Sequence, residues 1–120
     1  MKLMRRTLPA LLILGTVMQI PSTSIAQEQI HTIEIHARRY AFSPSEITLK
    51  KGEAVKLRMF SDDVPHSLLI PDLKINETIT KAHPDEVTVT PSNSGDFRGE
   101  CGRFCGSGHG SMLFTVHVKD

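Results

Sequence analysis

Near the end of the chain, four side chains that bind soft metal ions follow one another at short intervals. Cys101, Cys105, His109 and Met112 are separated by three, three and two residues. Thiolate, imidazole and thioether are ligands that copper prefers, and a cysteine with histidines and a weakly bound methionine is typical of electron-transfer copper sites. Glycines between these residues let the backbone turn tightly enough for the side chains to converge. The spacing therefore predicts a copper site in this segment.

Two other interpretations of the same segment compete with copper. In an oxidising compartment two cysteines form a disulfide by default, and the spacing of Cys101 and Cys105 permits one. The loop that this disulfide would close is so short that little stabilisation is expected from it. Two cysteines with two histidines also suit structural zinc, but zinc leaves Met112 unexplained. The joint occurrence of all four side chains at ligand spacing favours copper over both.

The segments around this loop alternate between apolar and polar residues, as half-buried strands do. Alternating runs cover residues 31–37, 47–49, 55–59, 64–70 and 87–89, and a strand rich in β-branched and aromatic residues closes the chain at 113–118. Glycine, proline, aspartate and serine separate these runs. Short alternating strands bounded by turn residues predict a small all-β sandwich.

Two further expectations come from this alternation. Residues 76–85 are polar and lack a clear period, so we expect a connection there with at most one helical turn. His31, His36 and His117 fall on the polar sides of their runs and are expected to face solvent.

Residues 1–26 are typical of a secretory signal peptide. Three basic residues precede a short apolar run over residues 8–20, and small residues end the segment at Ala26, the expected cleavage point. The run is shorter than the roughly 18 apolar residues that span a bilayer, and no later stretch is apolar enough to do so. We therefore expect one domain, residues 27–120, without a membrane span, in the periplasm or another extracytoplasmic compartment.

Charge and residue types exclude several functional classes. Without the three basic residues of the signal, eleven basic residues face thirteen acidic ones, a formal charge of −2. The two signs are interleaved without a basic stripe, so nucleic acid is not an expected partner. No nucleophile is paired with a base, and no pair of acidic residues stands in a recognisable catalytic setting, so enzymatic activity is not expected.

The copper-ligand segment resembles the metal-binding loop of cytochrome c oxidase subunit II, the binuclear CuA domain of the cupredoxin superfamily. The loop pattern of that family, C-x-x-x-C-G-x-x-H-x-x-M, is matched at every defined position from Cys101 to Met112. Upstream, Asp63-Val64-Pro65-His66-Ser67 is similar to the family segment D-V-x-H-S, which supplies the first histidine. The resemblance implies a cupredoxin-like Greek-key β-sandwich with two coppers per chain.

The resemblance also assigns a role to each ligand. Two histidines would each bind one copper, two cysteines would bridge the pair as thiolates, and a thioether and a backbone carbonyl would be weak ligands. The histidines are His66 and His109, and the bridging cysteines are Cys101 and Cys105. The thioether is that of Met112, and the carbonyl is that of Arg103.

Three departures from the family shape the expected function. No transmembrane helices precede the domain, Arg103 replaces the glutamate usual between the cysteines, and Tyr40 is the single tyrosine in a chain without tryptophan. We expect a stand-alone soluble form that carries single electrons between partners such as a c-type cytochrome. Oxidase activity would then belong to an assembly and not to this chain.

Two alternatives stay open at this point. The same ligands could serve a chaperone or scavenger that receives Cu(I) from a donor protein or delivers it to an acceptor. A mononuclear site using His66, Cys105, His109 and Met112 is the other alternative, and in that site Cys101 would have no role.

Overall fold

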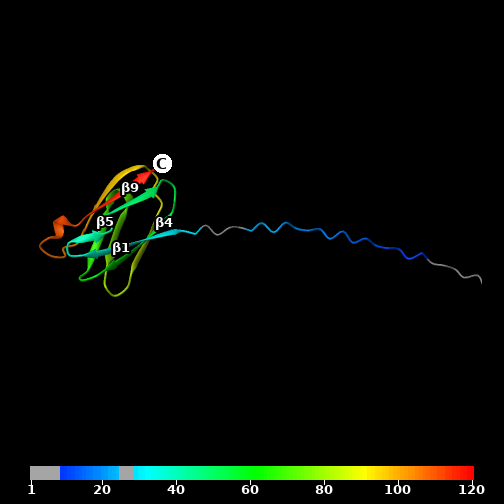
Figure 1. Cartoon of the computed structure of the whole chain (residues 1–120), viewed down its shortest axis with the longest axis horizontal. Helices are drawn as coiled ribbons and strands as arrows, with labels where there is room; N and C mark the ends of the chain where they lie inside the picture. The colour runs from blue at the N-terminus through cyan, green and yellow to red at the C-terminus, as the bar shows by residue number, and fades with distance from the viewer. Residues whose placement is uncertain (1–8, 25–28) are drawn as a thin grey trace, which may run out of the picture.

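The computed structural model describes residues 9–24 and 29–120 of the chain. Residues 9–24 contain neither helix nor strand and extend away from a folded domain that begins at β1 (Figure 1). The cleavage point expected after Ala26 and the basic start of the signal both lie outside the described residues. In the described part, no helix is long and apolar enough to cross a membrane.

The elements of the domain are short strands and two single turns of 3-10 helix. They are β1 (His31–Arg38), β2 (Ala41–Ser43), β3 (Glu46–Lys50), β4 (Val55–Ser61), β5 (His66–Ile70), η1 (Pro71–Leu73), β6 (Ile75–Ile79), β7 (Asp85–Val89), β8 (Gly95–Glu100), η2 (His109–Ser111) and β9 (Leu113–Lys119).

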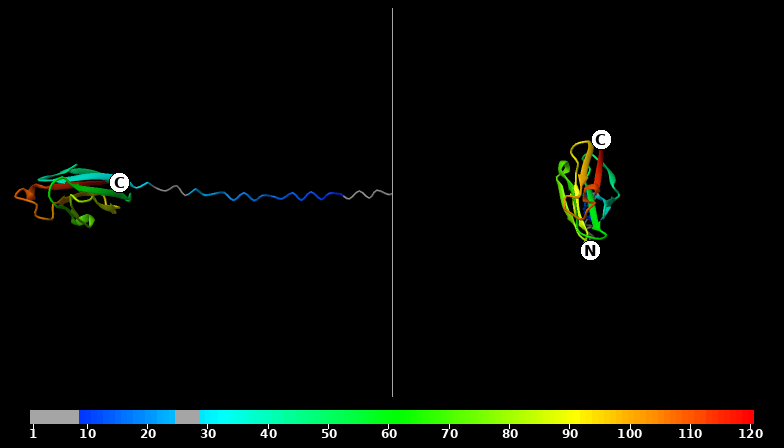
Figure 2. Two further views of the ribbon diagram at one scale, coloured as in Figure 1. Left: turned by 90° about the horizontal axis from the view of Figure 1, so that it is seen from below. Right: turned by 90° about the vertical axis from the view of Figure 1, so that its left-hand side faces the viewer.

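The strands form two sheets that pack face to face. One sheet has the order β2-β1-β4-β7 and the other β3-β9-β8-β5-β6. Strands β1 and β4 pair in parallel, as do β3 and β9, whereas the remaining pairs are antiparallel. Figure 2 shows the two layers from two further directions, with the loop before β9 at one end. The predicted all-β sandwich is confirmed.

The core lies between the sheets and is built by the predicted alternation. In β4, Val55, Leu57 and Met59 are buried while the residues between them are partly exposed. In β1, Ile35 and Ala37 are fully buried. Side chains of a strand point alternately to its two faces, so each such run supplies one row of the core.

The expectation that residues 76–85 form a connection is wrong for residues 76–79, which belong to strand β6. Strand β6 pairs with β5 along its whole length, and its ends, Ile75 and Ile79, are buried. The sequence hid this strand because it lies at a sheet edge and has a glutamate, Glu77, at the inward position between the two isoleucines. Burial raises the pKa of Glu77, and the neighbouring Asp85 carboxyl raises it further. Polar residues on edge strands also discourage pairing with other chains.

Replacing Phe114 by alanine should destabilise the fold strongly. Phe114 is 1% exposed and meets the ring of Phe42 edge to face, with centroids 5.7 Å apart. Losing a buried aromatic ring costs about 3–5 kcal/mol of unfolding free energy, measurable by urea denaturation of the metal-free protein. The matched control is Leu113→Ala on the opposite face of β9, where the side chain is 55% exposed; a change beyond about 0.5 kcal/mol there would contradict this account.

Candidate metal centre

The predicted ligands come from two places that the sandwich brings to one end. His66 is the first residue of β5, and the loop between β8 and β9 carries the others, from Cys101 to Met112. The Cys101 N–H donates to the Met112 carbonyl over 3.2 Å and joins the two ends of the loop. The loop therefore projects as a closed unit from the end of the sandwich (Figure 1).

Within this unit the sulfur atoms lie close together. Cys105 Sγ is 3.8 Å from Cys101 Sγ, 3.4 Å from Met112 Sδ and 3.9 Å from His109 Nδ1. The backbone oxygen of Arg103 lies 3.1 Å from Cys101 Sγ. Both cysteines are free and buried. Cys105 is thus the centre of the group, and the structure brings together all the loop residues that the sequence proposed as ligands.

His66 completes the group from the other segment. Among the described residues, His66, Cys101 and Cys105 form the one cluster of histidine, cysteine and acidic side chains that could hold a metal ion, with ligand atoms within 4.8 Å of one another. The His66 ring is fully buried, and its Nδ1 has no hydrogen-bond partner. A buried nitrogen left unpaired is costly. A soft metal ion at this cluster would satisfy that nitrogen, so the residues present fit copper.

Asp63 fixes the orientation of His66 and was not among the residues predicted from sequence. Its Oδ1 lies 2.7 Å from His66 Nε2, which leaves Nδ1 as the ring nitrogen available to a metal. A carboxylate on the distal nitrogen is the usual support of a metal-binding histidine, because it fixes the tautomer and the ring orientation. The signal available in the sequence was the carboxylate three residues before His66.

The Asp63 carboxylate is itself held by two backbone groups. It accepts hydrogen bonds from the N–H of Arg39 over 2.8 Å and from that of Val64 over 2.6 Å. Burial alone would raise the pKa of Asp63, but these bonds and the one to His66 outweigh it and lower the pKa to about 2. Asp63 is therefore ionised at neutral pH and remains an acceptor for the His66 ring.

Replacing Asp63 by asparagine should weaken copper binding by about 10–100-fold, the usual loss when such a supporting carboxylate is removed. The amide NH2 would face the N–H of Arg39 in one orientation and the donors Val64 N–H and His66 Nε2–H in the other. A neutral amide is also a weaker acceptor than a carboxylate, so the His66 ring is held less firmly. Competition with a chromophoric Cu(I) chelator measures the affinity. The control is Asp62→Asn, since Asp62 binds His36 Nδ1 at 2.9 Å on the surface. Equal affinities of the two variants would refute the role assigned to Asp63.

The environment of Cys105 keeps its thiol protonated as long as no metal is bound. Burial, and after it the neighbouring Cys101 thiol, raise the pKa of Cys105 to about 11. The metal-free thiol is therefore protonated at neutral pH, and metal binding must displace that proton.

Arg39 Nε donates to the Cys105 carbonyl over 2.9 Å, which ties the loop to the end of β1.

The remaining strand histidines lie away from this cluster. His31 is exposed, His36 is half-exposed beside Asp62, and the ring of His117 lies 2.6 Å from Asp96 on the outer side of its sheet. Hydrogen bonding to Asp96 raises the pKa of His117. The expectation that these histidines face solvent is confirmed.

Known proteins with similar sequence or structure share this fold. Residues 10–113 match the family described as a cupredoxin-like domain. A probable cytochrome c oxidase subunit 2 of Streptomyces avermitilis is 36% identical over 70 residues, covering 58% of this chain and 22% of that protein. Cytochrome c oxidase subunit 2 of Thermus thermophilus is 27% identical over 90 residues, covering 75% of this chain and 67% of that protein.

A solved structure gives the same answer for the fold. The periplasmic domain of subunit II of cytochrome oxidase from Bradyrhizobium japonicum superimposes with a TM-score of 0.70 at 14% identity, over 80% of this chain and 88% of that one. The chain spans less than a quarter of the Streptomyces relative.

Proposed function

This chain belongs to the cupredoxin-like domain family, and on that premise we propose that it carries single electrons at a binuclear copper site of the CuA type. The observation that carries the proposal is the arrangement around Cys105. The Cys101 thiol, the Met112 thioether and the His109 imidazole each have a ligand atom within 4 Å of Cys105 Sγ. His66, at the start of β5, joins the cluster with the two cysteines, and its buried Nδ1 has no hydrogen-bond partner.

Each residue has a part in this proposal. Cys101 and Cys105 would bridge two coppers, and His66 and His109 would each bind one of them through a ring nitrogen. Met112 Sδ and the Arg103 carbonyl would be the weak ligands. Copper in such a set supplies a reversible one-electron couple.

The protein contributes a rigid set of ligands. Cys101 directly follows β8, Met112 directly precedes β9, and His66 begins β5, so three strands of one sheet anchor the group. Cys101, Met112 and His66 are each at most 2% exposed. Ligands held this firmly rearrange little when the charge of the site changes, which favours fast electron transfer.

Metal analysis with spectroscopy tests the proposal. Copper-loaded protein should contain two coppers per chain, be purple, and give an electron paramagnetic resonance spectrum of one unpaired electron shared by two copper nuclei. One copper per chain, or the intense blue of a mononuclear site, would refute the binuclear assignment.

Copper delivery is a second candidate function, favoured by a hollow in the surface beside the group. A hollow of about 230 Å³ opens beside Cys105, and two thiols with a thioether form a soft donor set that suits Cu(I). Rapid transfer of Cu(I) to a chelator, without a reversible one-electron wave in voltammetry, would favour delivery. A reversible wave with slow copper release would favour electron transfer.

We also propose that the domain acts outside the cytoplasm after removal of residues 1–26. The basic and apolar start of the chain supports this, and the Bradyrhizobium domain with the same fold is periplasmic. Mass analysis of the protein from the periplasmic fraction should give a chain that begins at Gln27. A mass that retains the apolar run would contradict cleavage at this point.

A further inference from the structure

The hollow beside Cys105 has an unusual rim. Its lining includes Val64, Pro65 and Phe104 as apolar residues, and Arg39 and Arg103 as charged ones. Phe104 is 78% exposed, although it lies between the two cysteines in sequence and its ring centroid is 6.0 Å from that of His109. A large apolar ring in water at the entrance to a metal cluster suggests a contact surface, because aromatic and arginine side chains dominate binding interfaces.

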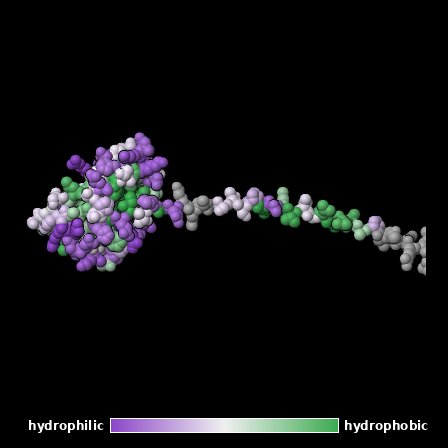
Figure 3. Space-filling model, in the orientation of Figure 1, coloured by the Kyte–Doolittle hydropathy of each residue, from purple (hydrophilic) through white to green (hydrophobic). Residues whose placement is uncertain are grey.

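The charge of this rim is positive. The residues that line the hollow include two arginines and no acidic side chain. Of the nearby carboxylates, the ionised Asp63 does not line the hollow and is bound by His66 and two backbone N–H groups, and Asp62 lies beside His36. The Arg39 guanidinium uses Nε for the Cys105 carbonyl and keeps its other nitrogens for a partner. Figure 3 shows the loop end as a pale, weakly polar tip bordered by hydrophilic side chains.

We propose that Phe104, Arg39 and Arg103 form the docking surface for a redox partner whose own contact face is acidic around an apolar centre. This inference rests on the proposed electron-transfer function and names its partner class. Phe104 would supply the apolar anchor, and the two arginines would steer and orient carboxylates around it. A partner bound here would contact the hollow that Cys105 lines, and the Phe104 ring would lie between the partner and His109.

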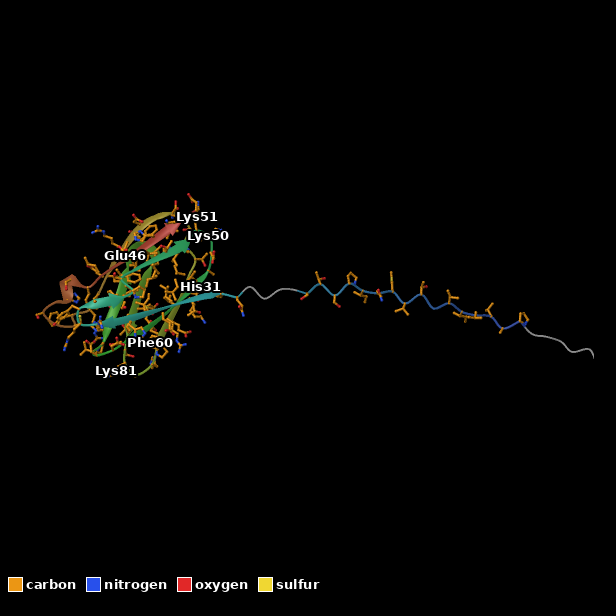
Figure 4. The ribbon with its side chains drawn as sticks, viewed as in Figure 1. His31, Glu46, Lys50, Lys51, Phe60 and Lys81 are labelled. Carbon is orange, nitrogen blue, oxygen red and sulfur yellow. The ribbon has the colours of Figure 1, made fainter. Side chains whose placement is uncertain are left out.

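The other cationic end of the molecule lacks these features. Lys50 and Lys51 lie at the end of the sandwich opposite the copper-ligand loop (Figure 4). Lys51 is near Asp120, 3.7 Å away. No predicted copper ligand lies among the described residues around those lysines. Positive charge and proximity to the ligands coincide at the loop end, so that end suits electron transfer better.

One cytochrome c in two charge forms tests the surface. The native, lysine-rich cytochrome presents a basic face, and succinylation of its lysines converts that face to an acidic one around the same haem. In stopped-flow experiments at low ionic strength, the acidic form should exchange electrons with the copper-loaded protein at least about tenfold faster, an advantage that should shrink as salt screens the charges. A faster reaction of the basic form would overturn the proposal.

Arg103→Glu and Lys50→Glu make the same charge change at the two ends. Arg103→Glu should slow the acidic cytochrome and accelerate the basic one, so that their order reverses. Damage to the copper site would instead slow both forms. Lys50→Glu should leave both rates within about twofold of the parent protein. Equal effects of the two substitutions would overturn the assignment of the surface.

Binding without electron transfer separates this inference from the proposed function. Isotope-labelled Cu(I)-loaded protein is titrated with the reduced succinylated cytochrome, so that no electron can move, and amide chemical shifts are recorded. Shifts centred on Phe104, Gly106 and Val64 support the docking surface. Shifts centred on Lys50 and Lys51, or no binding, overturn it. Docking at Phe104 without any electron exchange would refute the proposed function and leave the docking surface in place.

Discussion

If the loop holds the proposed pair of bridged coppers, replacing Cys101 by serine should remove one of them and abolish the purple spectrum. In a bridged pair both thiolates bind both metals, so one serine leaves a single thiolate that cannot hold the pair. Cys105 Sγ, which lies near both Met112 Sδ and His109 Nδ1, would remain as the thiolate of a mononuclear site. We expect about one copper per chain and a new blue or green absorption, measured by metal analysis and visible spectroscopy.

The outcome separates the two arrangements left open by the sequence. If the native site is mononuclear and uses Cys105 alone, Cys101→Ser leaves its spectrum and stoichiometry intact, and the binuclear proposal is then refuted. Cys105→Ser is the matched comparison, because both arrangements need that thiolate and both predict loss of the coloured site. The two variants together therefore distinguish a bridging role of Cys101 from a general loss of cysteine.

The fold should survive the Cys101 substitution. Cys101 is 2% exposed, and its Sγ lies 3.1 Å from the Arg103 carbonyl, which a serine hydroxyl at the same place can reach as a hydrogen-bond donor. Thermal unfolding of the metal-free variant should thus stay close to that of the parent. A large fall in the midpoint temperature would contradict this expectation, and the loss of copper would then be caused by unfolding and not by the missing thiolate.

The sequence predicted the parts of this molecule that depend on local pattern. The period-2 runs located the rows of core residues, such as Val55, Leu57 and Met59. Successive side chains of a strand point to opposite faces, so apolar residues at every second position lie on the buried face. The loop of proposed ligands could be predicted because its cysteine, histidine and methionine side chains are close in sequence. These side chains can converge on Cys105 because the glycines between them let the backbone turn tightly.

The parts that were missed depend on contacts between distant segments. Strand β6 (Ile75–Ile79) has a polar middle that is typical of a loop in sequence, and it is recognised as a strand only by its pairing with β5. Arg39 reaches the Cys105 carbonyl from the end of β1, and no spacing in the sequence indicates that bond. Asp63 was within reach of a local argument, since it lies three residues before His66, but its two backbone donors became visible only in the folded chain.

Gly106→Ala should destabilise the closed form of the loop that carries the proposed ligands. Gly106 has a φ of +141°, a region that side chains other than hydrogen rarely enter, and such a residue costs about 1–3 kcal/mol. A Cβ at this position would also lie 2.9 Å from Cε1 of Tyr40, well inside van der Waals contact. If the closed loop loses about 2 kcal/mol, its population falls and copper affinity drops roughly 30-fold. Chelator competition measures this loss.

Two further substitutions test whether conformation or space is the cause. Gly110→Ala is the control in the same loop, since no atom lies within 4 Å of the added Cβ, and its copper affinity should stay within about twofold of the parent. Gly108 has an ordinary φ of −90°, but its added Cβ would meet the Tyr40 ring. Removing that ring with Tyr40→Ala should therefore restore most of the affinity lost in Gly108→Ala and only part of that lost in Gly106→Ala. Equal recovery in both would show that crowding by Tyr40, and not the backbone angle of Gly106, limits closure of the copper loop.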